Sequence, residues 1–88
     1  MRYMVIETYR QGPRPVYARV AERGRMVPPG LVYVESWIEE RGLSRCFQLM
    51  ETEDPRLFDE WTANWNDLVE FEIVPVISSA EAAARAAG

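Results

Sequence analysis

Two β-α-β patterns follow one another within 88 residues, and this repetition limits the possible folds more than any other feature of the chain. Runs of β-branched and aromatic residues predict strands, and runs with helical spacing predict helices. The predicted strands cover 2–9, 31–40, 46–50 and 69–77, and the predicted helices cover 15–24 and 54–65. A chain of this length forms one domain.

Local signals mark where the helices begin. Pro13 and Pro15 can both occupy a first helical turn, where a missing N–H is not needed. Asp54-Pro55 predicts an acidic N-cap followed by proline at the first helical position. Ser78 and Glu81 form a capping-box pattern, which predicts a tail helix over 78–88. At about nine residues this tail helix is marginal alone, so it must dock or fray.

The order βαββαβ predicts a ferredoxin-like α+β fold. Right-handed crossovers and a hairpin between the second and third strands give an antiparallel sheet with spatial order 4-1-3-2. The fourth strand then lies at a sheet edge, and Pro75 supports this place because proline cannot donate to a ladder. Both main helices cover one sheet face and leave the other face open.

Alternation along the strands predicts which residues occupy each face of this sheet. The predicted helix-side residues are Met4, Ile6, Val32, Val34, Phe47, Leu49, Phe71 and Ile73. The predicted open-face residues are Tyr3, Val5, Glu7, Tyr9, Tyr33, Glu35, Trp37, Cys46, Gln48, Met50, Glu70 and Glu72. The second set is too apolar to face water alone, so we expect a sheet-on-sheet homodimer that leaves a polar cavity at the interface.

Composition excludes several classes of function. The net charge is −4, which argues against nucleic acid and anionic membrane surfaces as partners. The chain has no His and no Lys, so imidazole catalysis, haem ligation and Schiff-base chemistry lack their residues. We expect no cofactor and no metal site. Its one cysteine, the lack of a signal-like N-terminus and the lack of a long apolar run favour a cytoplasmic protein.

Five residues are candidates for ligand binding. Tyr33 and Trp37 could form an aromatic wall for a planar ligand, or they could pack across a dimer interface. Gln48 on a central strand needs hydrogen-bond partners, which could be a ligand or another side chain. Arg25 could reach an anionic ligand, or it could interact with the helix dipole. Glu35 could act as a general acid or base, or it could be solvated or paired with arginine.

Three further side chains complete these expectations. Glu7 and Glu72 could join Glu35 in a carboxylate cluster, in which one pKa would rise. Cys46 has no basic partner other than the adjacent Arg45 and is expected to be an inert small hydrophobe.

Two long blocks and the C-terminal segment resemble a known family. The blocks are GRM-x-P-x-G-L-x-Y-V-x-S-W over 24–37 and RCFQLMET-x-DP-x-LFDEW over 45–61, followed by FEIVPVISS-x-EAAA. They resemble a family of small bacterial proteins of unknown function within the dimeric α/β-barrel superfamily. The resemblance implies a ferredoxin-like protomer and a face-to-face dimer, and it implies no catalytic residues.

Two functional hypotheses remain open. The first is a homodimer that binds a small organic molecule or has a structural role. The second is a cofactor-free enzyme, similar to a monooxygenase or an isomerase, that uses Glu35, Tyr33 and Gln48. An enclosed pocket on which the polar residues converge would distinguish them.

Overall fold

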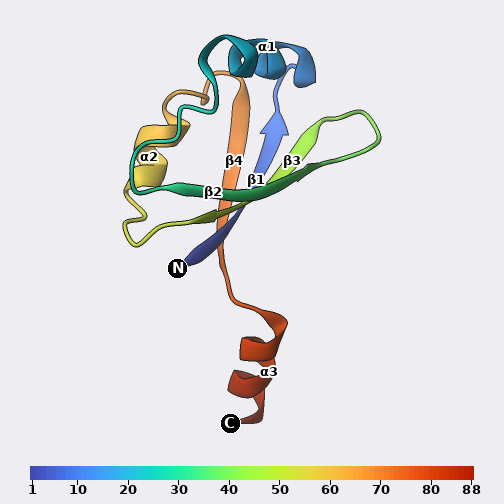
Figure 1. Cartoon of the computed structure of the whole chain (residues 1–88). Coiled ribbons are helices and arrows are strands. Elements are labelled where there is room, and N and C mark those ends of the chain that lie inside the picture. Colours follow the sequence, from blue (N-terminus) through green and yellow to red (C-terminus); the bar gives the residue numbers. More distant parts are fainter.

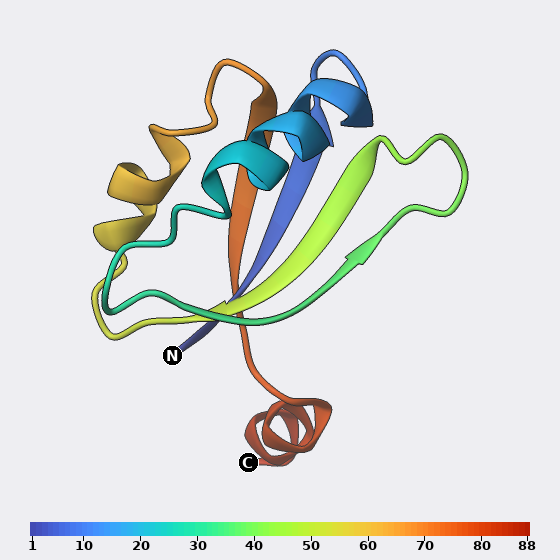
Figure 2. The same ribbon diagram turned by 45° about the horizontal axis from the view of Figure 1, so that its top comes forward.

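A computed structural model describes all 88 residues and contains the predicted order of strands and helices (Figure 1). The elements are β1 (Arg2–Tyr9), α1 (Pro13–Arg23), β2 (Val32–Ile38), β3 (Arg45–Glu51), α2 (Leu57–Thr62), β4 (Val69–Val76) and α3 (Ser79–Ala87). The four strands form one antiparallel sheet in the order β2-β3-β1-β4. This order confirms the ferredoxin-like α+β fold. Figure 2 shows α1 and α2 on the same side of the sheet.

The predicted position of β4 at an edge of the sheet is confirmed. Pro75 lies near the end of β4, opposite Tyr3. The predicted start of α2 is wrong. The carboxylate of Asp54 accepts from the backbone N–H of Arg56 at 3.1 Å, which forms a turn before the helix. Regular helix begins only at Leu57, and Arg56 occupies its N-cap position without a side-chain hydrogen bond.

The predicted faces of β1 and β3 are reversed in the structure. Tyr3, Val5 and Glu7 of β1 are buried beneath the helices. The register pairs Val5 with Ile73 of β4 and with Gln48 of β3. Paired residues point to the same face of a sheet, so Ile73 and Gln48 also face the helices. The helix-facing residues are Tyr3, Val5, Glu7, Tyr9, Cys46, Gln48, Met50, Val69, Phe71 and Ile73. Glu7 and Gln48, which were predicted for an open interface, therefore lie under the helices, whereas Glu70 and Glu72 are on the open side as predicted.

A β-bulge in β2 explains why this strand does not follow simple alternation. Tyr33 pairs with Met50, whereas Glu35 pairs with Leu49, so Val34 is one extra residue. A bulge shifts the side-chain phase of the strand that carries it. Tyr33 therefore faces the helices, and Glu35 faces the open side.

The open face of the sheet carries adjacent apolar side chains together with charged residues such as Glu35, Arg45 and Glu72. Its apolar residues, placed by strand register, are Met4, Ile6, Val32, Trp37, Phe47, Leu49, Val74 and Val76. Two of them, Val32 and Trp37, are more than half exposed. In a single chain, this face leaves large hydrophobic side chains in contact with water.

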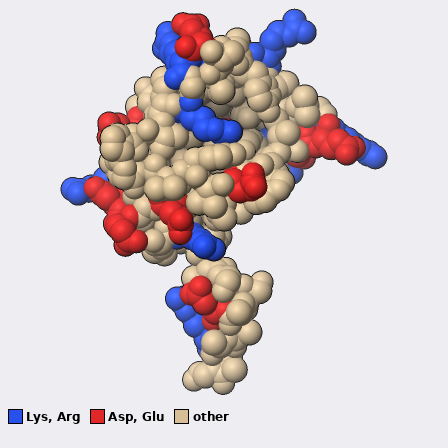
Figure 3. All heavy atoms as spheres, in the orientation of Figure 1, with Lys and Arg blue, Asp and Glu red and all other residues tan.

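The tail helix α3 extends away from the sheet in Figures 1 and 2. The predicted cap is confirmed, because the hydroxyl of Ser78 accepts from the backbone N–H of Glu81 at 3.1 Å. Every residue of α3 is exposed. None of the helices is both long and apolar enough for a membrane crossing. Figure 3 shows acidic and basic side chains interspersed over one view of the molecule.

Candidate functional site

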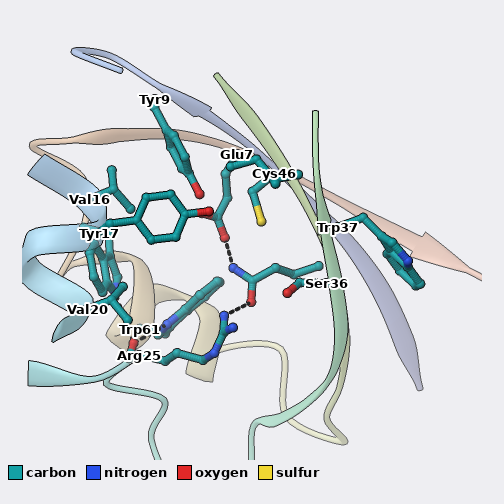
Figure 4. Close-up of a pocket in the computed structure, with 13 residues that line it drawn as sticks. Glu7, Tyr9, Val16, Tyr17, Val20, Arg25, Ser36, Trp37, Cys46 and Trp61 are labelled. Carbon is teal, nitrogen blue, oxygen red and sulfur yellow. Dashed lines mark hydrogen bonds between the residues drawn. The ribbon is translucent and has the colours of Figure 1, made fainter. Parts of the chain in front are cut away.

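A cavity of about 150 Å³ lies between α1 and the helix-facing side of the sheet (Figure 4). Nine of its thirteen lining residues are hydrophobic, so its walls favour an apolar body. Val16 and Val20 of α1 line one side, and Trp61 and Trp65 line another. The polar lining residues are Glu7, Arg25, Ser36 and Gln48.

Three of these polar residues form a continuous chain of hydrogen bonds. Arg25 donates from Nη1 to Oε1 of Gln48 at 3.2 Å. Gln48 in turn donates from Nε2 to Oε2 of Glu7. Because a guanidinium can only donate, the oxygen of the Gln48 amide must face Arg25. The amide NH₂ then faces Glu7, so Glu7 receives this bond whether or not it is ionised.

Glu7 is the only acid that lines the cavity, and its pKa is strongly shifted. Its place in the middle of β1, between Val5 and Tyr9 on the helix-facing side, leaves it only 5% exposed. Burial raises the pKa of Glu7 from 4.5 to about 7, against the lowering effects of the Gln48 hydrogen bond and the Arg25 charge. A carboxyl group with such a pKa can accept or release a proton near neutral pH.

Arg25 is held at the mouth of the cavity by contacts to both its backbone and its side chain. Its carbonyl oxygen accepts from Nε1 of Trp61 at 3.0 Å and from Nε1 of Trp65 at 3.1 Å. Its guanidinium carbon lies 4.0 Å from the ring centroid of Tyr33, a stacked cation–π contact. The residues on either side, Gly24 and Met26, have φ of 71° and 59°. Arg25 forms no ion pair with a carboxylate within the chain.

The bulge in β2 places two hydroxyl groups beside Arg25. Tyr33 precedes the extra residue and Ser36 follows it, and both face the helices. The two hydroxyl oxygens are 2.6 Å apart. This contact fixes the Tyr33 ring on which the guanidinium of Arg25 stacks. Bulges are frequent next to functional sites because they redirect side chains in this way.

Two more groups at the Glu7 end of the cavity keep their protons at neutral pH. Burial and, to a smaller extent, the nearby charge of Glu7 raise the pKa of Cys46 to about 11. Burial is also the main cause that raises the pKa of the Tyr9 hydroxyl above its ordinary range. Cys46 is therefore a thiol rather than a thiolate here, and it is a poor nucleophile.

The structure separates the five predicted site residues into two groups. Gln48 and Arg25 line the cavity, and Tyr33 stacks against the guanidinium of Arg25 without lining the cavity itself. Glu35 is exposed on the open side, where its carboxylate accepts from the N–H of Ser36 at 3.2 Å. Trp37 is also among the lining residues, but it is 55% exposed and Figure 4 shows its ring pointing away from the cavity.

The predicted carboxylate cluster does not form. Glu72 pairs with Ile6 on the open side of the sheet, whereas Glu7 points to the helices. Glu35 is likewise on the open side, so Glu7 is the acid of the cavity. Glu7 shares its alternation phase with the apolar residues Val5 and Tyr9, but this is a weak signal because the phase of Met4 and Ile6 is equally apolar. Trp61 and Trp65 pack in the core, and their indole N–H groups also position Arg25.

No group of three or more His, Cys, Asp or Glu side chains is arranged to hold a metal ion. Glu7 can transfer a proton, and Arg25 can bind a ligand group that accepts hydrogen bonds.

Comparison with known proteins places the chain in a family but does not assign an activity. No curated protein and no solved structure matches it. The family model described as a domain of unknown function, DUF3303, matches residues 1–88. The chain therefore belongs to the DUF3303 family.

Proposed function

We propose that the protein is a homodimer that binds a small organic molecule in the cavity beneath α1. The observation that carries this proposal is the chain from Arg25 through Gln48 to Glu7 within mostly hydrophobic walls. Ligand sites commonly combine apolar walls with a few fixed polar groups. Burial of Glu7 costs folding free energy, and a core without a binding role would not need it.

The open face of the sheet supports the dimeric part of the proposal. Trp37 is adjacent to Phe47 across β2 and β3, and Ile6 is adjacent to Phe47 across β1 and β3. A contiguous apolar surface of this kind marks an interaction site. A second copy of the same face would cover it symmetrically, as in the dimeric α/β barrels that the sequence resembles. The cavity lies on the other side of the sheet, so each protomer would keep its own site.

Native mass spectrometry combined with a blocked-cavity variant tests this proposal. We expect a dimer at micromolar concentration and a small molecule retained after mild purification. Val20→Trp fills the cavity from α1 and should remove the retained molecule, whereas Ala18→Trp adds the same side chain on the exposed side of α1. Retention by the Val20→Trp variant, or a monomeric unmodified protein, would contradict the corresponding part of the proposal.

The perturbed acid Glu7 favours a second candidate, a cofactor-free isomerase. Glu7 would remove a proton from a carbon next to a carbonyl group, and the electron pair of that C–H bond would form an enolate. Arg25 would stabilise the enolate oxygen through its guanidinium. Glu7 would then return the proton to another carbon of the conjugated system, so the reaction needs no oxidant and no cofactor.

Exchange of carbon-bound hydrogen tests the isomerase candidate. The protein is incubated in D₂O with a set of β,γ-unsaturated and 2-oxo carboxylic acids, and proton NMR follows the loss of their C–H signals. We expect exchange with the unmodified protein and none with Glu7→Gln. The control Glu35→Gln changes an exposed acid on the opposite sheet face and should retain exchange. Equal exchange by both variants would show that Glu7 is not the base of the reaction.

A further inference from the structure

The cavity has a fixed positive group at its mouth and a small apolar interior. A volume of about 150 Å³ is the size of cavity that accommodates a benzene molecule. Val16, Val20 and the two indoles of Trp61 and Trp65 provide flat or branched apolar surfaces. The interior therefore fits one ring rather than an extended or bicyclic molecule.

The guanidinium of Arg25 has capacity for a ligand that the protein leaves unused. Of its N–H groups, Nη1 donates to Gln48, and no other side-chain hydrogen bond of Arg25 is present. No carboxylate pairs with it, and the only acid of the cavity, Glu7, is separated from it by Gln48. A planar guanidinium with free N–H groups matches the geometry of a carboxylate.

The position of Arg25 is set before any ligand arrives. Two indole N–H groups hold its carbonyl oxygen, and Tyr33 supports the face of its guanidinium. Preorganisation of this kind lowers the entropy lost on binding. The same indoles line the cavity, so they connect the residue at the mouth with the wall that a ring would contact.

We propose that the cavity takes a monocyclic organic acid, whose carboxylate pairs with Arg25 and whose ring lies between α1 and the indoles of Trp61 and Trp65. This inference rests on the proposed function, that is, on small-molecule binding in this cavity. It specifies the charge and size of the ligand. A hydroxyl or carbonyl substituent on the far side of the ring would be placed toward Glu7 and the Tyr9 hydroxyl, which lie at the other end of the cavity from Arg25 in Figure 4.

The three tryptophans of the chain make the test direct. In ¹H–¹⁵N NMR spectra, the indole signals of Trp61 and Trp65 report on the cavity, and that of Trp37 is an internal reference because its ring points away. The full chain is titrated with benzoate, benzamide and benzylamine at pH 6. These probes share one ring and differ in charge. We expect benzoate to shift the Trp61 and Trp65 signals and to bind on the order of tenfold more tightly than benzamide.

Variants of arginine show whether this preference comes from Arg25. Arg25→Gln should abolish the preference for benzoate, and Arg25→Lys, which keeps the charge without the planar fork, should retain part of it. Arg41→Gln removes the same charge from the β2–β3 loop and should leave the preference unchanged. The lysine variant keeps the test valid if the glutamine variant folds poorly.

Each other result overturns the inference in a distinguishable way. Equal binding of benzoate and benzamide, unaffected by Arg25→Gln, would leave cavity binding standing and exclude an acid as the preferred ligand. Tighter binding of benzylamine would assign the site to a cation. Failure of all three probes to shift Trp61 and Trp65 would exclude the monocyclic class, while retention of a different molecule in native mass spectrometry would still support the proposed function.

Discussion

Gln48 donates a hydrogen bond to Glu7 diagonally across β3 and β1, where the register pairs Gln48 with Val5 and Glu7 with Cys46. The two side chains share the helix-facing side of the sheet. Arg25 fixes the orientation of the amide, so the Gln48 contact stays the same when Glu7 changes protonation. The proton of a neutral Glu7 can then reside on its other oxygen, where it is available to a ligand.

The first prediction concerns stability as a function of pH. The folded pKa of Glu7, about 7, exceeds its ordinary value of 4.5, so the protonated form favours the folded state. This contribution is fully present below pH 4.5 and is lost as the pH rises through about 7. We expect the free energy of unfolding to fall by a few kcal/mol, on the order of 1.4 kcal/mol per pKa unit, between pH 4.5 and 7.5.

Chemical denaturation at a series of pH values measures this effect. The absence of histidine leaves few other groups that titrate in this window. Glu7→Gln should flatten the profile and be the more stable protein at pH 8. Glu35→Gln, at an exposed site, should keep the profile of the unmodified protein. A Glu7→Gln profile with the original slope would show that another group is responsible.

The second prediction concerns the carbonyl oxygen of Arg25, which two indoles share. Trp61→Phe or Trp65→Phe alone leaves this oxygen one N–H donor. The double variant leaves it none, and an unsatisfied buried polar group costs about 1–3 kcal/mol. We expect the double variant to lose more stability than the two single variants together, by roughly 1 kcal/mol or more, in urea unfolding followed by circular dichroism. Additive losses would show that the indoles act only through packing.

The fold was predictable to a greater extent than the site. The alternation of elements and the edge preference of Pro75 together predicted the sheet order. The face of β1 was not predictable from alternation, because Met4 and Ile6 in one phase are as apolar as Tyr3 and Val5 in the other. Only the burial of Tyr3 and Val5 beneath the helices, known from the structure, decides between them.

The composition of the site depended on the same choice. Gln48 and Arg25 could be named from the sequence because an amide on a central strand and an arginine after a helix each need partners. To predict that they converge with Glu7, one must know which face of β1 lies under the helices. The place of Tyr33 requires the bulge at Val34, and no glycine or proline marks that bulge in the sequence.

The third prediction concerns the open face. Trp37 is 55% exposed in the single chain and borders Phe47, so it should be buried in the proposed dimer. Trp37→Asp should produce a monomer in sedimentation velocity experiments, because it places a charge in an apolar interface. Ala18→Asp adds the same charge on the exposed side of α1 and should remain dimeric. A monomeric unmodified protein would contradict the proposed dimer.

The fourth prediction concerns the tail. Every residue of α3 is exposed, and the helix makes no packing contribution to the core. Removal of residues 79–88 should therefore leave the thermal midpoint of unfolding unchanged within a few degrees. A conversion from dimer to monomer on truncation would show that α3 contacts the second copy.

The last prediction concerns acid. Arg19 of α1 binds both carboxylate oxygens of Asp67 at 2.8 and 2.7 Å, which links α1 to the segment before β4. This pair lowers the pKa of Asp67 from 3.8 to about 2. A lowered pKa contributes stability above the ordinary value, and this contribution is lost as the pH falls through about 2. Asp67→Asn should therefore reduce the slope of stability between pH 4 and 2. Glu40→Gln, which changes an exposed acid with no ion pair, should keep that slope, and an unchanged slope in Asp67→Asn would mean that solvent screens the pair.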